Sequence, residues 1–373
     1  MALHISMHPH PSLCTVLIAT IFFGCHPPSP KTNNTCDVSA ELSALHDRTF
    51  RDETGEFVTQ STLGSIDLTN GFFQSLGTNG RRCVSCHVPS QGWTITPSYL
   101  HDLFERTAGG ICDDGHGLSA VFRPNDGAVN PGANMSTLMA RRVAYSLLLT
   151  RGLIRIELPI PPGAEFTLVT VDDPYHFANA EQLSLFRRPL PTTNLKFDSA
   201  VMWDDREAAP GAPIISDLLS QASTAVVIHA QGAPLSDVQR AAIVTLETSL
   251  VTAQSADLHA GRLDDGGARG GPSAILAQPF HIGINDNFGD PITGSPFSPI
   301  IFSLYDRWTE APFSDVSEAR RMIARGQSLF NSKPILISGV SGINDEAAFG
   351  KPEKLSGTCG TCPTTRLGAE TIL

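Results

Sequence analysis

Two cysteines and a histidine stand close together in one short motif, Cys83-Val-Ser-Cys86-His87. Thiols three positions apart can add to the two vinyl groups of one haem, and the imidazole that follows directly can bind the iron as its proximal ligand. A thioredoxin-like site would need a βαβ setting, and a zinc site would need a second pair of ligands at finger spacing. The motif therefore predicts one covalent haem c, with Cys83 and Cys86 as attachment residues and His87 as the iron ligand.

The ligand on the other face of the iron is left open by the sequence. A methionine there would raise the reduction potential relative to a second histidine. Spacing does not choose among the candidates downstream of the motif, which are His101, His116, Met135, Met139, His176, Met202 and His229.

A second pair of thiols lies near the end of the sequence, in Gly357-Thr-Cys359-Gly-Thr-Cys362-Pro363. It lacks the histidine, because Pro363 stands where the ligand would be. Eleven residues follow Cys362, too few to surround a second haem. Three interpretations compete: a disulfide, a degenerate second haem site at Cys359 and Cys362, or a truncation or frame error at the end of a longer protein. We favour the last.

The first 25 residues are typical of an export signal, and residues 26–40 are typical of a flexible tether. The apolar run from Leu13 to Phe23 is too short to cross a bilayer as a helix but suits the core of a secretory signal. Gly24-Cys25 resembles a lipoprotein cleavage box, so Cys25 is a candidate for lipidation, with a plain signal peptide as the alternative. The sequence thus predicts a periplasmic or cell-envelope protein, with a membrane tether if Cys25 is lipidated.

Two further cysteines, Cys36 and Cys112, belong to neither pair. An oxidising compartment would allow them to form a disulfide. The alternative is two unrelated thiols, because a bridge requires Cα atoms within about 7 Å of each other.

Composition excludes several classes of protein. The 373 residues carry a net charge of −11, which disfavours a nucleic-acid partner. Hydrophobic residues make up 41% and charged residues 17%, so the chain is not a disordered one. With 32 glycines and 27 prolines we expect long loops and neither a coiled coil nor a pure bundle. A redox partner protein is not identified by the sequence.

Periodicity and capping residues predict a mainly α fold, with cytochrome c-like haem domains, long loops and a small β insert. Two short strands are expected within residues 153–171, the second at 166–171. Ser136 is the expected N-cap of a helix to Leu149. The expected helices cover 68–77, 136–149, 214–230, 236–250 and a stretch from about 314 to 330.

The glycine-rich stretch at 264–271 is the best linker in the chain. We therefore place a first haem domain at 41–263, a linker at 264–274, and an incomplete second cytochrome c-like domain at 275–373.

Several segments resemble the bacterial di-haem cytochrome c peroxidase and MauG-like family over roughly residues 65 to 362. The Met202-Trp-Asp-Asp-Arg206 segment is similar to the Phe-Trp-Asp-Gly-Arg element of that family. The other matching segments are the haem motif at 79–87, a helix at 244–250 that would close the first haem domain, and 324–330 with 357–362 as the opening of the second.

The resemblance implies a two-haem architecture and a role for Trp203 in passing electrons between haems. The alternative for Trp203 is an ordinary core tryptophan. The peroxidatic glutamate of the family, often followed by methionine, has no counterpart, since the corresponding region reads Val227-Ile-His229-Ala-Gln231.

Three functions remain after this comparison. The leading hypothesis is an exported c-type cytochrome that transfers electrons. The second is a di-haem peroxidase-like oxidoreductase that reduces peroxide at an open iron face. The third is a haemless structural or binding lipoprotein, which requires the Cys-x-x-Cys-His motif to be accidental.

Overall fold

The structure is a computed structural model that describes residues 42–359 apart from 113, 161, 163, 165–166, 180, 199–200, 203–205, 208–212, 282–283, 285–289, 291, 311, 313–316, 342, 346 and 348–349. Helices take up 33% of the residues and strands 14%. The expectation of a mainly α fold is therefore wrong, and the fold is mixed α/β. The predicted features that lie outside the described residues are the signal and tether at 1–40, Cys25, Cys36, Trp203 and Cys362.

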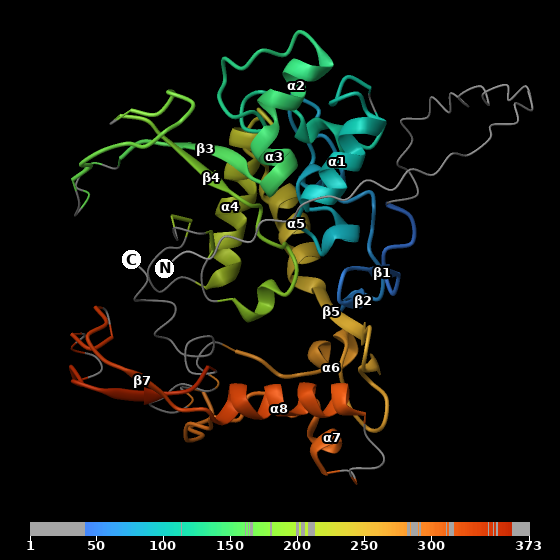
Figure 1. Cartoon of the computed structure of the whole chain (residues 1–373), viewed down its shortest axis with the longest axis vertical. Helices are drawn as coiled ribbons and strands as arrows, with labels where there is room; N and C mark the ends of the chain where they lie inside the picture. The colour runs from blue at the N-terminus through green and yellow to red at the C-terminus, as the bar shows by residue number, and fades with distance from the viewer. Residues whose placement is uncertain are drawn as a thin grey trace, which may run out of the picture. The chain divides into compact units, whose positions relative to one another are not determined.

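The elements follow one another along the chain as labelled in Figure 1. The α-helices are α1 (Pro97–Arg106), α2 (Leu138–Ala144), α3 (Ser146–Arg151), α4 (Ile214–His229), α5 (Asp237–Ser249), α6 (Pro272–Leu276), α7 (Asp306–Glu310) and α8 (Glu318–Ser332). The strands are β1 (Thr49–Arg51), β2 (Gly55–Ser61), β3 (Ile154–Leu158), β4 (Leu183–Arg187), β5 (Leu250–Asp257), β6 (Gly261–Arg262), β7 (Ile335–Ile337) and β8 (Leu355–Gly357).

An antiparallel sheet of order β1-β2-β5-β6 accounts for much of the missed β structure. Along β2, buried and half-buried side chains alternate, as expected for a strand with one face on the core. β2 pairs with β5, where Thr59 faces Thr252 and their hydroxyl oxygens lie 2.7 Å apart. Because these partners are 193 residues apart in sequence, local periodicity could not reveal the pairing.

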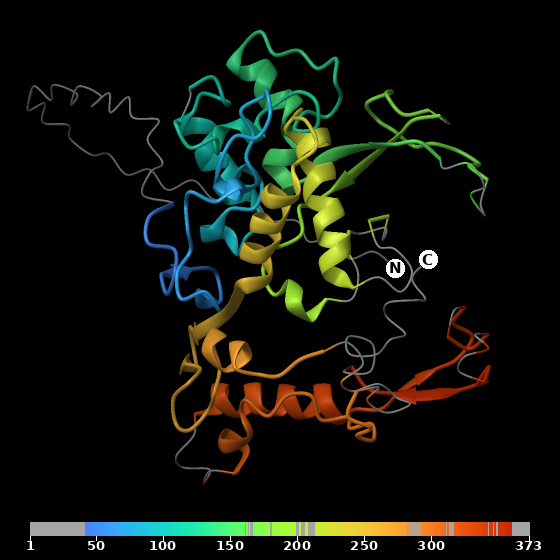
Figure 2. The ribbon, with the colours of Figure 1, turned by 180° about the vertical axis from the view of Figure 1, so that it is seen from behind.

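Two helices that position the site agree with their sequence signals. The expected helix at 214–230 is α4, and the next is α5, whose N-terminus forms the predicted capping box. The Ser236 backbone N–H donates to Gln239 Oε1 over 3.0 Å, and the Gln239 backbone N–H donates to Ser236 Oγ over 3.4 Å. The helices α4 and α5 pack side by side, as both views show (Figures 1 and 2).

The helix expected over 136–149 is divided in two. Its N-cap is Thr137 rather than Ser136, since the Thr137 side chain accepts from the Ala140 backbone N–H. The chain leaves helical geometry at Tyr145, between α2 and α3. The Tyr145 side chain is fully buried and its hydroxyl donates to the Phe122 carbonyl oxygen, so tertiary contacts prevail over local propensity here.

The small β insert exists, but its second strand is not where the sequence placed it. β3 pairs with β4 in antiparallel register, from Ile154 opposite Arg187 to Leu158 opposite Leu183. The described residues of 166–171 form no strand, and Val169 is 90% exposed. β-branched composition alone therefore misplaced this strand, because the described residues 167–171 are neither paired with a strand nor buried.

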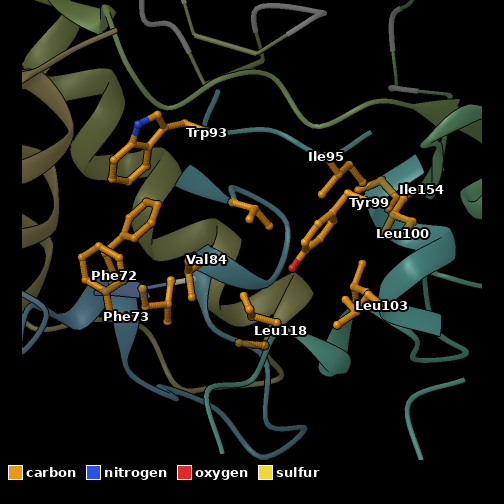
Figure 3. Packing of buried hydrophobic residues seen from close by; sticks show 14 of the residues in the cluster. Phe72, Phe73, Val84, Trp93, Ile95, Tyr99, Leu100, Leu103, Leu118 and Ile154 are labelled. Carbon is orange, nitrogen blue, oxygen red and sulfur yellow. The ribbon is translucent and has the colours of Figure 1, made fainter. Parts of the chain in front are cut away.

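Two separate hydrophobic clusters hold the described part of the chain. The larger draws its buried members from residues 42–250, and Figure 3 shows Phe72, Phe73, Val84 and Trp93 within it. The smaller gathers around Trp308 of α7, with members from 260 to 324. The predicted linker at 264–274 contributes Ala268 to the smaller cluster, and the domain boundary stays a prediction.

Within the described residues, no helix combines the length and the apolar composition that a bilayer crossing requires.

Candidate functional site

The Cys-x-x-Cys-His motif folds as a single tight turn. Cys83–Ser85 is a 3₁₀ turn, after which the backbone N–H groups of Cys86 and His87 both donate to the Cys83 carbonyl oxygen, over 3.1 and 3.0 Å. Val84 points away into the hydrophobic core and is fully buried. The turn thus directs the two thiols and the imidazole toward one side, as attachment to a single planar group requires.

That side opens into a cavity of about 250 Å³. Both thiols and the His87 ring line it, together with residues from β3, α4, α5 and the segment that follows β4. Its lining is dominated by apolar side chains, among them Leu76, Ile154, Ile156, Pro189, Leu190, Leu195, Val201, Met202, Ile214, Leu218, Ala222, Val226 and Ile243. An apolar cavity beside the motif fits the hydrophobic face of a porphyrin.

His87 is held in the tautomer that an iron ligand needs. Its Nδ1 lies 3.3 Å from the Trp93 carbonyl oxygen, an acceptor, so Nδ1 donates there in the tautomer that leaves Nε2 as the nitrogen for iron. Burial, with a smaller contribution from His229, lowers the pKa of His87 to about 4, against opposing hydrogen bonds to the Trp93 and Leu190 backbone. Trp93 is itself fixed, because its indole N–H donates to Thr59 Oγ1 over 2.9 Å.

The two thiols of the motif are not arranged for redox chemistry of their own. Both are free rather than joined in a disulfide. Burial raises the pKa of Cys83, and it raises the pKa of Cys86 to about 11. A reactive Cys-x-x-Cys pair needs a lowered thiol pKa, so the site environment disfavours the redox-thiol alternative.

The cavity brings together two of the seven candidate sixth ligands. Met202 and His229 line it. The other candidates lie in the described part of the chain but away from the cavity lining, and they are His101, His116, Met135, Met139 and His176. Met139, for example, is 68% exposed on α2.

A buried charged cluster holds His229. Its Nδ1 lies 2.8 Å from Asp126 Oδ2, and the other Asp126 oxygen forms an ion pair with Arg81. The Arg81 and Asp126 side chains are only 3% and 9% exposed. Burial raises the pKa of Asp126, but Arg81 and His229 outweigh it and hold the pKa below its usual value. Sequence patterns gave no signal for Arg81 or Asp126, because their pairing is tertiary.

Glu247 is a second residue that sequence reasoning missed. It lies on α5 within the 244–250 segment, is 4% exposed and lines the cavity. Burial raises the pKa of this carboxyl group to about 8. The cavity wall therefore contains an acid that holds its proton at neutral pH.

The remaining predicted site residues are only partly described. Cys359 is an exposed free thiol, which disagrees with the disulfide interpretation of the second pair, and Cys362 lies outside the described residues. Cys112 forms a disulfide, while Cys36 lies outside the described residues.

Between residues 42 and 359, as far as they are described, no three His, Cys, Asp or Glu side chains are grouped to hold a metal ion by themselves. A zinc site of that kind has no candidate there, whereas haem takes only axial ligands and thioether bonds from the chain.

The chain was finally compared with known proteins. No protein family, no curated protein and no solved structure matches it.

Proposed function

We propose that this protein is an exported c-type cytochrome, which carries haem bound covalently at Cys83 and Cys86 and transfers single electrons. The observation that carries the proposal is the shared orientation of both thiols and the His87 ring into one apolar cavity. A thiol pair and an imidazole on one turn, facing such a cavity, are the requirements for attaching and ligating haem.

The chain's own residues divide the work at this site. Cys83 and Cys86 would hold the edge of a bound porphyrin, and His87 would offer Nε2 to its iron, because the Trp93 carbonyl oxygen accepts the hydrogen bond from Nδ1. The apolar residues of α4 that line the cavity, with Ile243 of α5, would exclude water around a bound haem, which limits reorganisation when the charge of the site changes. Three arginines also line the cavity and could form ion pairs with the carboxylate groups of a bound haem: Arg187, Arg188 and Arg206. Bound haem would supply the iron that cycles between ferric and ferrous states.

Export belongs to the same proposal. The signal-like first 25 residues and the lipoprotein-like Cys25 support a periplasmic or cell-envelope location. A redox partner protein is required for electron transfer, and the net charge of −11 disfavours nucleic acid as a ligand.

A peroxidase related to the di-haem cytochrome c peroxidase and MauG-like family is the second candidate. It is favoured by one observation, the pairing of His229 on the cavity wall with Asp126 behind it, since a histidine held by a carboxylate can act as an acid–base group over an open iron face. Peroxide turnover together with high-spin ferric iron would select this candidate over the electron carrier.

The attachment residues give the direct test of the proposed function. Produced in a bacterium with cytochrome c maturation enzymes, the protein should retain haem stain on a denaturing gel. The combined change Cys83→Ala and Cys86→Ala should abolish the stain, because no thioether can then form. The matched control is Cys359→Ala, which removes an exposed thiol far from the motif in sequence and should leave the stain unchanged.

Either of two results would contradict this proposal. One is an unstained wild-type band from cells that mature a known c-type cytochrome. The other is stain that persists in the double variant at the wild-type level.

A further inference from the structure

We infer that His229 is the second axial ligand of the haem iron, so that His87 and His229 bind the metal from opposite faces. The inference rests on the proposed covalent haem and goes beyond it by assigning the residue that sets the coordination. Among the candidate ligands, only His229 and Met202 line the cavity, and both lie in its described wall.

The two histidines share the same hydrogen-bond arrangement. His87 Nδ1 lies 3.3 Å from the Trp93 carbonyl oxygen, and His229 Nδ1 lies 2.8 Å from Asp126 Oδ2. Each oxygen is an acceptor, so each ring directs its Nδ1–H toward an oxygen, and Nε2 is the nitrogen that would bind the iron. A histidine that binds a metal characteristically donates its other ring N–H to a carboxylate or a carbonyl oxygen.

The main chain fixes His229 to the haem motif. Asn79 Nδ2 donates to the His229 carbonyl oxygen over 2.8 Å, and Arg81 Nη1 donates to the same oxygen over 3.4 Å. These donors stand four and two residues before Cys83. The end of α4 and the turn that carries the thiols are therefore joined directly, and the second ligand does not depend on a separate loop for its position.

Two glycines permit this close approach. Gly77 and Gly232 form a β-bridge between the chain before the motif and the chain after α4. A Cβ on Gly77 would lie 1.9 Å from the Ala230 carbonyl oxygen, and one on Gly232 would lie 2.5 Å from the Leu76 carbonyl oxygen. Only glycine allows backbones this near, so the sequence specifies the contact that holds His229 beside the site.

Met202 is the rival ligand, and its surroundings orient it less. A thioether sulfur is a weak hydrogen-bond acceptor, so no second group can set its direction as Asp126 sets that of an imidazole. His229 has a ring fixed by a buried carboxylate that is itself held by Arg81. The more precisely positioned donor is the better ligand, because less freedom is lost when it binds.

Asp126 acts as a positioning residue in this arrangement. By accepting a hydrogen bond from His229 Nδ1–H, the Asp126 carboxylate would strengthen electron donation from Nε2 to the iron and so favour ferric iron. Asp126→Asn should therefore raise the reduction potential while leaving the coordination low-spin, whereas a purely structural role for Asp126 would leave the potential of the folded protein unchanged.

The test is the ferric spectrum of the full-length haem protein and of the variants His229→Ala, Met202→Ala and His101→Ala. Wild type should be low-spin by absorption and electron paramagnetic resonance, and near-infrared magnetic circular dichroism should identify two nitrogen axial ligands. His229→Ala should keep its haem stain but become high-spin, and added imidazole should restore the low-spin spectrum. His101→Ala, which removes a histidine of α1 away from the cavity lining, should match the wild type.

The outcomes separate the inference from the function on which it rests. Wild type without haem stain would overturn the proposed function. Stained protein whose low-spin spectrum survives His229→Ala, or is lost in Met202→Ala instead, would overturn the inference alone. A variant that fails to fold does not remove the test, because the dichroism spectrum of wild type distinguishes histidine–methionine from histidine–histidine ligation.

Discussion

The Glu247→Gln variant is expected to be more stable than wild type at pH 8. As the pH rises above 5, its free energy of unfolding should fall much less than that of wild type. Burial raises the pKa of the Glu247 carboxyl group from 4.5 to about 8. Between these values the folded protein keeps a proton that the unfolded chain releases. The stability that protonated Glu247 contributes to the folded protein is therefore fully present below pH 4.5. It is lost as the pH rises to about 8, at about 1.4 kcal/mol per pH unit.

The total loss in the free energy of unfolding is on the order of 5 kcal/mol, because the pKa shift of Glu247 spans several pH units and its side chain is shielded from solvent. Glutamine has nearly the same shape and does not ionise. Asp198 also lines the cavity, and burial raises its pKa to about 6, which gives a loss of the same sign at lower pH in both proteins.

Urea unfolding of wild type and variant from pH 5 to pH 9 measures this difference. The control is Glu53→Gln at an exposed glutamate, which should follow the wild-type curve. If wild type and Glu247→Gln keep the same difference in unfolding free energy across the range, the buried protonated carboxyl group is not present.

Arg81→Met is expected to destabilise the protein by about 3–5 kcal/mol. Arg81 and Asp126 form an ion pair whose side chains are almost wholly buried. Removing the guanidinium leaves the Asp126 carboxylate buried without its arginine partner, with only the hydrogen bond from His229 Nδ1 remaining, and it also removes the Arg81 bonds to the Ala120 and Val121 carbonyl oxygens. Chemical denaturation at pH 7 measures the change.

The matched control is Arg240→Met, which breaks the ion pair between Arg240 and Asp237 on the surface of α5. This exposed pair should contribute about 1 kcal/mol or less. Adding Asp126→Leu to Arg81→Met should recover part of the loss, since both charges are then gone. Equal small effects of Arg81→Met and Arg240→Met would show that Asp126 is not a buried anion.

The sequence predicted those features that local residues determine. The capping box at Ser236 and Gln239 placed the start of α5 because both partners lie within one turn. The Cys-x-x-Cys-His spacing placed its three side chains on one turn for the same reason. The sequence failed at the sheet of β2 and β5 and at the partner of β3, where each strand depends on a distant segment.

In the candidate site, too, the features that depend on distant segments could not be predicted from the sequence. His229 could be named as a possible ligand but not chosen, because its partner Asp126 is 103 residues away and its carbonyl oxygen is held by Asn79, 150 residues away. Glu247 lies within the helix expected at 244–250, yet its character as a buried acid depends on the packing of α5 against the cavity.

The intact mass of the matured protein under denaturing conditions tests the central claim most directly. Thioether bonds survive unfolding, so the account predicts a chain heavier by the mass of one haem, with the added mass located on the peptide that contains Cys83 and Cys86. A matured chain at its unmodified mass, or haem located on another peptide alone, would contradict the account.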